Sequence, residues 1–129
     1  MKPDAEPYHA KPYSVPKAHE EVFKREIDRL VDLKVLEPCA GSEWASQCFI
    51  IPKKNGTVRF ITDFRRLNEN LKRKPYILPN LQDSIRRHES FSFLTKMDLN
   101  MSYYTLELDE ESSKLCTIIT PWGQFRYLR

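Results

Sequence analysis

Glycine, cysteine and long apolar runs are all scarce in this chain of 129 residues. Its three glycines, at positions 41, 56 and 123, are too few and too far apart to form a glycine-rich phosphate loop. Cys39, Cys48 and Cys116 are odd in number and widely spaced, which disfavours a disulfide framework or a structural zinc site and favours a reducing intracellular compartment. The longest apolar run covers only residues 49–51, whereas a membrane helix needs about 20 residues. We therefore expect a soluble protein with no membrane partner.

The composition is nevertheless that of one modest folded domain. Hydrophobic side chains make up 40% of the chain and charged side chains 30%, with seven Phe, six Tyr and two Trp to build a core. The net charge is only +3, but residues 53–74 hold eight Lys and Arg against two Asp and Glu. Such a concentrated positive charge is typical of a surface that faces phosphates. A solvated charged loop is the alternative on charge alone.

The first half of the chain predicts an extended arm, one helix and a β-hairpin. Four prolines disfavour helix in the arm, residues 1–17. Apolar residues at helical spacing predict an amphipathic helix over 18–36. Strands are expected at 47–52 and 58–62, joined through Asn55-Gly56, a pair typical of a type I′ turn.

The second half predicts one more helix and several strands. The helix spans about 80–89, with Asn80 as its N-cap. Residues 109–113 form a turn or a single helical turn. Strands are expected at 91–99, 104–108, 115–120 and 124–128, the last of them uncovered. The predicted fold class is α+β, with a mainly antiparallel sheet and two or three helices.

One carboxylate stands out because it ends a predicted apolar strand. Asp98 precedes Tyr103 by five residues, and the basic hairpin lies upstream. Carboxylates at strand ends hold the divalent ions of phosphoryl-transfer enzymes, although a single carboxylate is not enough. An isolated Asp in such a setting is more often a cap or a turn residue. Serine or cysteine nucleophiles find no support, since none lies in an elbow-like setting and the three histidines are scattered.

Several motifs together resemble the reverse transcriptase of Gypsy-type long-terminal-repeat retrotransposons. The match covers nearly the whole chain and keeps the motifs in order. The matching runs are Tyr8 to Pro12, Ser42 to Ser46, Phe49 to Phe60, Asp63 to Asn68, and Asp98-Leu99 through Pro121-Trp122-Gly123. The resemblance implies a fragment of a right-hand polymerase, with an arm (1–17), a fingers-like region with the basic hairpin (18–90) and the first part of a palm (91–129).

The resemblance also implies a role for individual residues in binding the incoming deoxynucleotide. Lys54 and Arg59 match cations that hold the triphosphate, and Lys53 shares this role because the matching lysine is ambiguous. The backbone amides of Met101 and Ser102 would face the triphosphate. Tyr103 matches the ring that leaves no room for a 2′-hydroxyl, whereas ordinary packing is the alternative for Tyr104.

Template and metal roles follow from the same resemblance. Ile61, Arg65 and Asn68 match positions near the template strand. Asp98 matches the first catalytic aspartate, and the Leu99 carbonyl would be a further ligand to Mg²⁺ or Mn²⁺. The implied partners are a primed RNA or DNA template, deoxynucleoside triphosphates and the remainder of the polyprotein, in the cytoplasm or a virus-like particle.

Three departures from the family pattern bear on function and stability. The family's Tyr-x-Asp-Asp hairpin is missing, and no Asp-Asp pair occurs anywhere in the chain. We therefore expect an incomplete palm, with metal bound only when the rest is present. Lys34 stands where the family has a helix-ending Gly, at a cost of about 1 kcal/mol in a left-handed conformation. Ser102 also replaces a usual Gly.

Three functions remain open at this point. The first is part of an RNA-directed DNA polymerase, a nucleotidyltransferase that extends a primer by two-metal phosphoryl transfer and is inactive as the isolated chain. The second is a truncated or co-opted remnant that binds nucleic acid through residues 53–74 without catalysis. The third is a degenerate product with no function.

Overall fold

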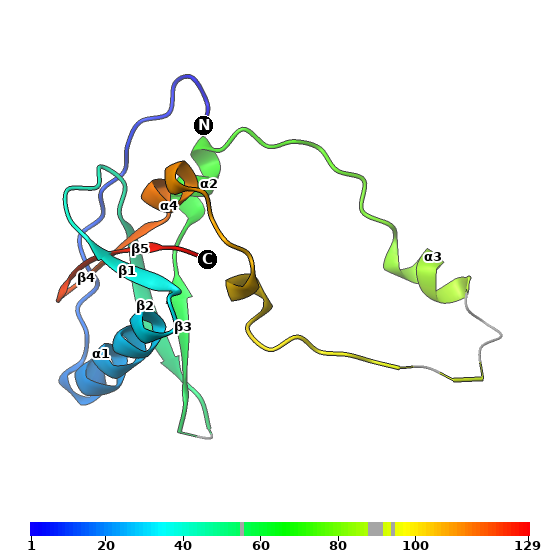
Figure 1. Ribbon diagram of the computed structural model, residues 1–129, viewed down its shortest axis with the longest axis horizontal. Coiled ribbons are helices and arrows are strands. Elements are labelled where there is room, and N and C mark those ends of the chain that lie inside the picture. Colours follow the sequence, from blue (N-terminus) through cyan, green and yellow to red (C-terminus); the bar gives the residue numbers. More distant parts are fainter. Residues whose placement is uncertain (55, 88–91, 94) are drawn as a thin grey trace.

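The computed structural model describes residues 1–54, 56–87, 92–93 and 95–129, and a five-stranded sheet organises the fold (Figure 1). Across the sheet the order is β1-β5-β4-β2-β3. Strands β2 and β4 pair in parallel, while the other three neighbouring pairs are antiparallel. The expected α+β class is confirmed, and the mainly antiparallel sheet has one parallel pair as its exception. The strands are β1 (Leu36–Cys39), β2 (Ser46–Pro52), β3 (Val58–Thr62), β4 (Thr117–Thr120) and β5 (Gly123–Tyr127).

Among the described residues there are four α-helices and one 3-10 helix, so the expectation of two or three helices is wrong. A turn or a single helical turn was predicted at 109–113, and the helical alternative is confirmed by the short helix that begins there. A helix at 65–70 was not expected, because it buries only Leu67 and so shows no apolar stripe. The helices are α1 (Lys17–Asp32), α2 (Arg65–Asn70), α3 (Leu81–Arg86), η1 (Ser102–Thr105) and α4 (Glu110–Leu115).

The core lies between α1 and the sheet. Phe23, Ile27 and Leu30 recur at helical spacing and are all fully buried, as the amphipathic pattern predicts. The Phe23 ring meets the rings of Phe60 and Trp122 edge-on, with centroids 5.7 and 5.5 Å away. These contacts fix α1 against β3, which matters for the site below.

The end of α1 explains why the helix stops before residue 36. Lys34 has φ +57°, the left-handed position expected from the missing glycine. Its amide donates to the Val31 carbonyl (3.0 Å), and the Val35 amide donates to the Leu30 carbonyl (2.9 Å). This is a Schellman end, in which Val35 and Leu30 also meet in the core. The strand β1 that follows was not predicted, because Pro38 disfavours a strand; β1 tolerates it at the edge of the sheet.

The basic hairpin is confirmed as β2 and β3, paired from Pro52 opposite Val58. The Lys53 amide donates to the Thr57 carbonyl (2.7 Å), and the Gly56 amide donates to the Lys53 carbonyl (3.1 Å). Gly56 has φ +78°, a conformation that glycine adopts without strain. The predicted type I′ turn depends on Asn55, which lies outside the described residues.

The proline-rich arm runs in extended form across the body of the molecule (Figure 1). Its Ala10 amide donates to the Ala45 carbonyl, and the Ala45 amide donates to the Tyr8 carbonyl, both at 2.9 Å. Further along, the Tyr13 ring meets Phe49 of β2 edge-on. At the start of the arm, Lys2 donates its amide to the Asn70 carbonyl. The arm therefore joins β2 to α2.

Two predicted strands are wrong. Residues 92–93 and 95–99 form no strand, and residues 88–91 and 94 lie outside the described residues. The segment 104–108 begins in η1 and continues as irregular chain. Both segments have strand-like composition, but a strand also needs a neighbour to take its backbone hydrogen bonds, and the sheet offers none here. Residues 71–87 instead run out from the body and carry α3 (Figure 1).

The other two predicted strands and the second predicted helix are present in the structure. Strand 115–120 is confirmed as β4, and strand 124–128 as β5. The expectation that this last strand is uncovered is wrong, because β1 and β4 pair with its two edges. Helix α3 starts after Asn80, whose side chain accepts the Gln82 amide (3.0 Å) as predicted. It ends at Arg86, and residues 88 and 89 of the predicted helix lie outside the described part. No helix in that part is long and apolar enough to cross a membrane.

Candidate functional site

A cleft of about 1260 Å³ lies between α1, the hairpin and the segment around η1. It gathers side chains from three regions that are far apart in the sequence. From α1 come Val22, Arg25, Glu26 and Arg29; from the hairpin and the turn after it, Lys53, Gly56, Thr57, Val58, Arg59, Phe60, Thr62 and Phe64; from the later segments, Leu99, Asn100, Met101, Ser102, Tyr103, Tyr104, Leu106, Leu108, Cys116, Tyr127 and Arg129. The cleft thus combines a largely apolar lining with several cations.

Six of the eleven residues predicted from the sequence line this cleft. They are Lys53 and Arg59 of the hairpin, and Leu99, Met101, Ser102 and Tyr103. The hairpin and the segment 99–103 are separated by some forty positions, so their meeting is a property of the fold. Lys54 is exposed beside Lys53 and does not line the cleft. Ile61, Arg65 and Asn68 also lie outside its lining.

The shape of the segment 101–105 sets what it presents to the cleft. Met101 has φ +52°, and the Tyr104 amide then donates to the Met101 carbonyl (2.9 Å), which starts η1. The Thr105 hydroxyl donates to the Ser102 carbonyl (2.7 Å) and closes the turn. In this turn Tyr103 is 87% exposed, whereas its neighbour Tyr104 is half-buried. The segment therefore offers the Tyr103 ring to solvent and uses Tyr104 as its anchor.

The anchor is a group of aromatic rings beneath η1. Tyr104 stacks on Tyr127, and Phe64 meets Tyr127 edge-on. The buried Tyr127 hydroxyl lies 2.8 Å from the Thr62 hydroxyl at the end of β3. Burial raises the pKa of Tyr127 above its ordinary value, so this phenol stays protonated. The group joins the floor of the cleft to the hairpin strand that carries Arg59.

Asp98 lies immediately before the cleft-lining Leu99 and is itself exposed. The prediction that it ends a strand is wrong, since residues 95–99 are irregular. Within the described residues, no three His, Cys, Asp or Glu side chains lie close enough together to hold a metal ion.

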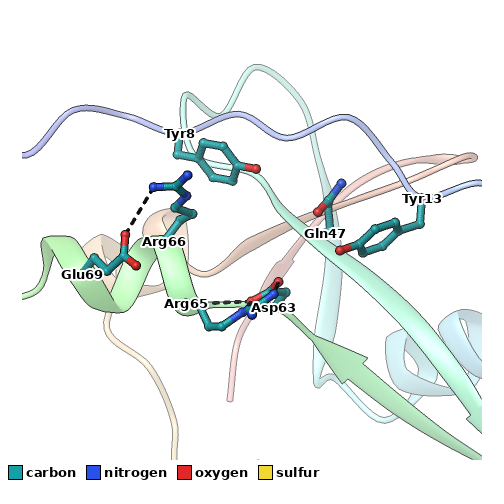
Figure 2. Close-up of a pocket in the computed structure, with 7 residues that line it drawn as sticks. All are labelled: Tyr8, Tyr13, Gln47, Asp63, Arg65, Arg66 and Glu69. Atoms are coloured by element: carbon teal, nitrogen blue, oxygen red, sulfur yellow. Dashed lines mark hydrogen bonds and ion pairs between the residues drawn. The ribbon is translucent and has the colours of Figure 1, made fainter.

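A smaller pocket of about 310 Å³ lies where the arm crosses β2 and α2, and it contains Arg65 (Figure 2). Arg65 is bound through two nitrogens to the Asp63 carboxylate, at 2.8 and 2.7 Å. This pairing, together with the Arg65 amide, lowers the pKa of Asp63 to about 2. On the far side of the pocket, the Arg66 guanidinium lies over the Tyr8 ring, 5.9 Å from its centre. Arg65 is thus exposed but held in one orientation.

Sequence reasoning missed the cleft-facing residues of α1 and the role of Asp63. Arg25, Glu26 and Arg29 sit next to the buried face of α1, at the one-turn spacing that places side chains side by side. That spacing is visible in the sequence, but only the position of the hairpin reveals which polar stripe of the helix lines the cleft.

The amino-acid sequence is similar to those of several known proteins. No protein-family model matches the chain. An uncharacterized protein of Caenorhabditis elegans, K02A2.6, is 34% identical over 129 residues, and the Pol polyprotein from Drosophila melanogaster transposon 412 is 26% identical over 132 residues, each match covering 98% of this chain. An enzymatic polyprotein of figwort mosaic virus is 26% identical over 91% of the chain. The homologues are retroelement Pol polyproteins. The chain spans about a tenth of the first two relatives (10% and 11%) and 18% of the third.

Solved structures agree on the fold. The prototype foamy virus protease-reverse transcriptase superposes with a TM-score of 0.78 at 19% identity, covering 98% of this chain and 17% of that one. The foamy viral protease-reverse transcriptase in complex with double-stranded DNA gives a TM-score of 0.68 at 16% identity, covering 95% of this chain and 20% of that one. At this identity the likeness concerns the fold alone. The resemblance noted from the motifs is thus confirmed for retroelement Pol polyproteins in general.

Proposed function

We propose that this chain is the fingers and first palm portion of an RNA-directed DNA polymerase from a Gypsy-type retroelement. In this proposal residues 18–90 are the fingers, residues 91–129 begin the palm, and residues 1–17 are the arm. The observation that carries the proposal is the cleft, because the hairpin cations Lys53 and Arg59 meet the segment 99–103 there. Similarity to Pol polyproteins and to the fold of a reverse transcriptase supports it.

The cleft suits the triphosphate of a deoxynucleotide. Phosphoryl transfer depends mainly on positioning and on neutralising negative charge. Arg59 and Lys53, with Lys54 at the hairpin tip, supply the charge. The backbone amides of Met101 and Ser102 supply donors. Tyr103, with its ring exposed at the cleft, is proposed to exclude a ribose 2′-hydroxyl by occupying its space.

The template is proposed to pass the outer face of the hairpin and α2. Ile61, Arg65 and Asn68 would contact it, with Arg65 held ready by Asp63. A guanidinium fixed in this way can bind a backbone phosphate without first losing its own freedom of motion. The structure of a foamy viral protease-reverse transcriptase that shares the fold contains double-stranded DNA, which is consistent with such a partner.

The metal ions of the proposed reaction do not fit the described residues alone. Among those residues, Asp98 does not belong to any group of three His, Cys, Asp or Glu side chains that could hold a metal ion, and paired Mg²⁺ or Mn²⁺ ions need several oxygen ligands. We propose Asp98 and the Leu99 carbonyl as two ligands of a set that is otherwise supplied from outside this chain. It follows that the isolated chain should not extend a primer.

A chimera tests the proposal. The chain replaces the aligned segment of the transposon 412 Pol polyprotein, with which it is 26% identical. The chimera should extend a primed RNA template, and Asp98→Asn should abolish incorporation while template affinity stays unchanged, because it removes a metal ligand and no phosphate contact. Asp83→Asn, an exposed position on α3, serves as the control. Full activity of the Asp98→Asn chimera, or primer extension by the 129 residues alone, would contradict the proposal.

A nucleic-acid-binding remnant without catalysis is the second candidate, and the charge of residues 53–74 favours it. If about four phosphates are neutralised, the affinity of the isolated chain for duplex should fall with salt at a slope near −0.9 times that number. Both candidates predict this salt dependence, but only the polymerase predicts an active chimera. Affinity that ignores salt would rule out the remnant.

A further inference from the structure

We propose that Arg25 of α1 is a third cation of the cleft and binds the same polyphosphate as Lys53 and Arg59. The inference rests on the proposed function and extends it to a helix that neither the motifs nor their spacing assigned to ligand binding. The ligand class is a chain of linked phosphates, as in a nucleoside triphosphate. Its argument comes from helix geometry and from the ion pairs of the cleft.

Helix geometry directs one polar stripe of α1 into the cleft. The contact of Phe23 with Phe60 packs the buried face of α1 against β3. The polar face beside it therefore lies next to the hairpin. Val22, Arg25, Glu26 and Arg29 share that face at intervals of three or four residues, and all four line the cleft. Lys24, one position before Arg25, is exposed and does not line it.

Ion pairing separates the cations of the cleft into two classes. Arg29 is bound through two nitrogens to Glu26, at 2.7 and 2.9 Å, and Arg129 pairs with Glu107 at 3.0 Å. Arg25, Lys53 and Arg59 have no ion-pair partner in the part of the chain that the structure describes. The three unpaired cations come from two adjoining elements that both line the cleft, α1 and the hairpin.

An unpaired cation in a partly apolar cleft is suited to an anion. The apolar lining, including Phe60, Leu99 and Leu106, screens charge less than open water does. A triphosphate carries several negative charges along its length and can contact cations on two walls at once. Arg25 would then hold it from α1, and Lys53 and Arg59 would hold it from the hairpin.

The test measures binding of inorganic tripolyphosphate and of thymidine triphosphate to the 129-residue chain by NMR titration at low salt. Arg25→Gln and Arg59→Gln should each weaken binding about three- to five-fold, the usual effect of one partly exposed charge contact. Lys24→Gln removes the same charge from the same helix and should leave binding within about 1.5-fold. Arg25→Lys should recover most of the loss. Thermal melting of each variant checks that the fold is intact.

A second variant should strengthen binding. Glu26→Gln removes the carboxylate that holds Arg29, so Arg29 becomes a fourth unpaired cation and the cleft loses its one lining acid. Affinity for tripolyphosphate should rise about three-fold or more. A loss of affinity would contradict this account of the ion pairs.

The outcomes separate the inference from the function on which it rests. If Arg59→Gln weakens binding and Arg25→Gln behaves like Lys24→Gln, Arg25 is not part of the site, while the proposed function stands. If the wild-type chain binds neither probe, the inference is wrong, and the proposed function is judged by the chimera alone.

Discussion

Tyr104 and Tyr127 stack with their ring centroids 6.3 Å apart and their planes inclined by 26°. The contact joins η1 to the last strand, and Tyr127 in turn reaches Thr62 of the hairpin. Both walls of the cleft are therefore held by one buried hydroxyl and one ring pair. The consequence is that the stability of the fold and the shape of the cleft depend on the same few residues.

Removing that hydroxyl should destabilise the protein. Tyr127→Phe keeps the ring but leaves the half-buried Thr62 hydroxyl without its partner, which should lower the free energy of unfolding by about 1–2 kcal/mol. Urea denaturation of the wild type and the variant measures this difference in the free energy of unfolding. Tyr103→Phe deletes a hydroxyl from an exposed ring and should change stability by less than about 0.5 kcal/mol. Equal stability of the two variants would show that the bond to Thr62 contributes nothing.

The end of α1 predicts a stabilising substitution. Lys34 occupies a left-handed position at φ +57°, which glycine adopts at no steric cost. Lys34→Gly should therefore raise the free energy of unfolding by up to about 1 kcal/mol. Lys24→Gly, in the exposed middle of the same helix, should lower it by about the same amount. Chemical denaturation of both variants gives the comparison, and a destabilising Lys34→Gly would speak against strain at this position.

Acid should loosen the junction of β3 and α2. The pKa of Asp63 lies at about 2 in the folded chain, below its ordinary value of 3.8, chiefly because Arg65 donates two hydrogen bonds to it. A carboxylate whose pKa is lowered by folding stabilises the fold above its ordinary pKa and loses that effect as the pH falls through the folded value. Wild-type stability should thus decline between about pH 4 and pH 2.

Asp63→Asn should flatten this decline, because its side chain cannot gain a proton in that range. Asp32→Asn, exposed at the end of α1, removes the same charge and should leave the decline in place. Urea midpoints at pH 5, 3 and 2 test both variants. Parallel curves for wild type and Asp63→Asn would mean that the pair with Arg65 does not form in solution.

An element of this structure can be predicted from the sequence when its own residues show an apolar repeat or a turn motif. The helix around Phe23 and Ile27 repeats its apolar residues every turn, and the hairpin has a Gly56 turn between two apolar runs, so both were predictable. Helix α2 buries only Leu67, so its sequence shows no helical repeat of apolar residues from which it could be predicted. The edge strand β1 contains Pro38 and becomes a strand only because β5 lies beside it.

Some residues of the candidate site could likewise be predicted from the sequence, and others could not. Motifs supplied Lys53, Arg59 and Tyr103, and the fold brings them to one cleft. The prediction of a strand ending at Asp98 is wrong, because a strand-like composition does not form a strand without a neighbouring strand to pair with. Arg25 could not be assigned from the sequence at all, because a charged residue on an exposed helix face looks the same whether it meets water or a ligand.

The sugar gate gives the sharpest functional prediction. In the transposon 412 chimera, Tyr103→Ala should admit ribonucleotides, because the ring proposed to fill the space of a 2′-hydroxyl is gone. Discrimination between deoxynucleotide and ribonucleotide, measured as the ratio of kcat/KM values, should fall by at least about ten-fold, since a steric exclusion worth about 1.4 kcal/mol or more is lost.

Tyr103→Phe is the matched control for the gate, because it keeps the ring and should keep the discrimination. The comparison separates steric exclusion from a contact made by the hydroxyl: if Tyr103→Phe relaxed the sugar preference as much as Tyr103→Ala, a hydrogen bond rather than the volume of the ring would select the sugar. If neither variant changed the preference, Tyr103 would not lie beneath the sugar, and its 87% exposure at the cleft would need another partner.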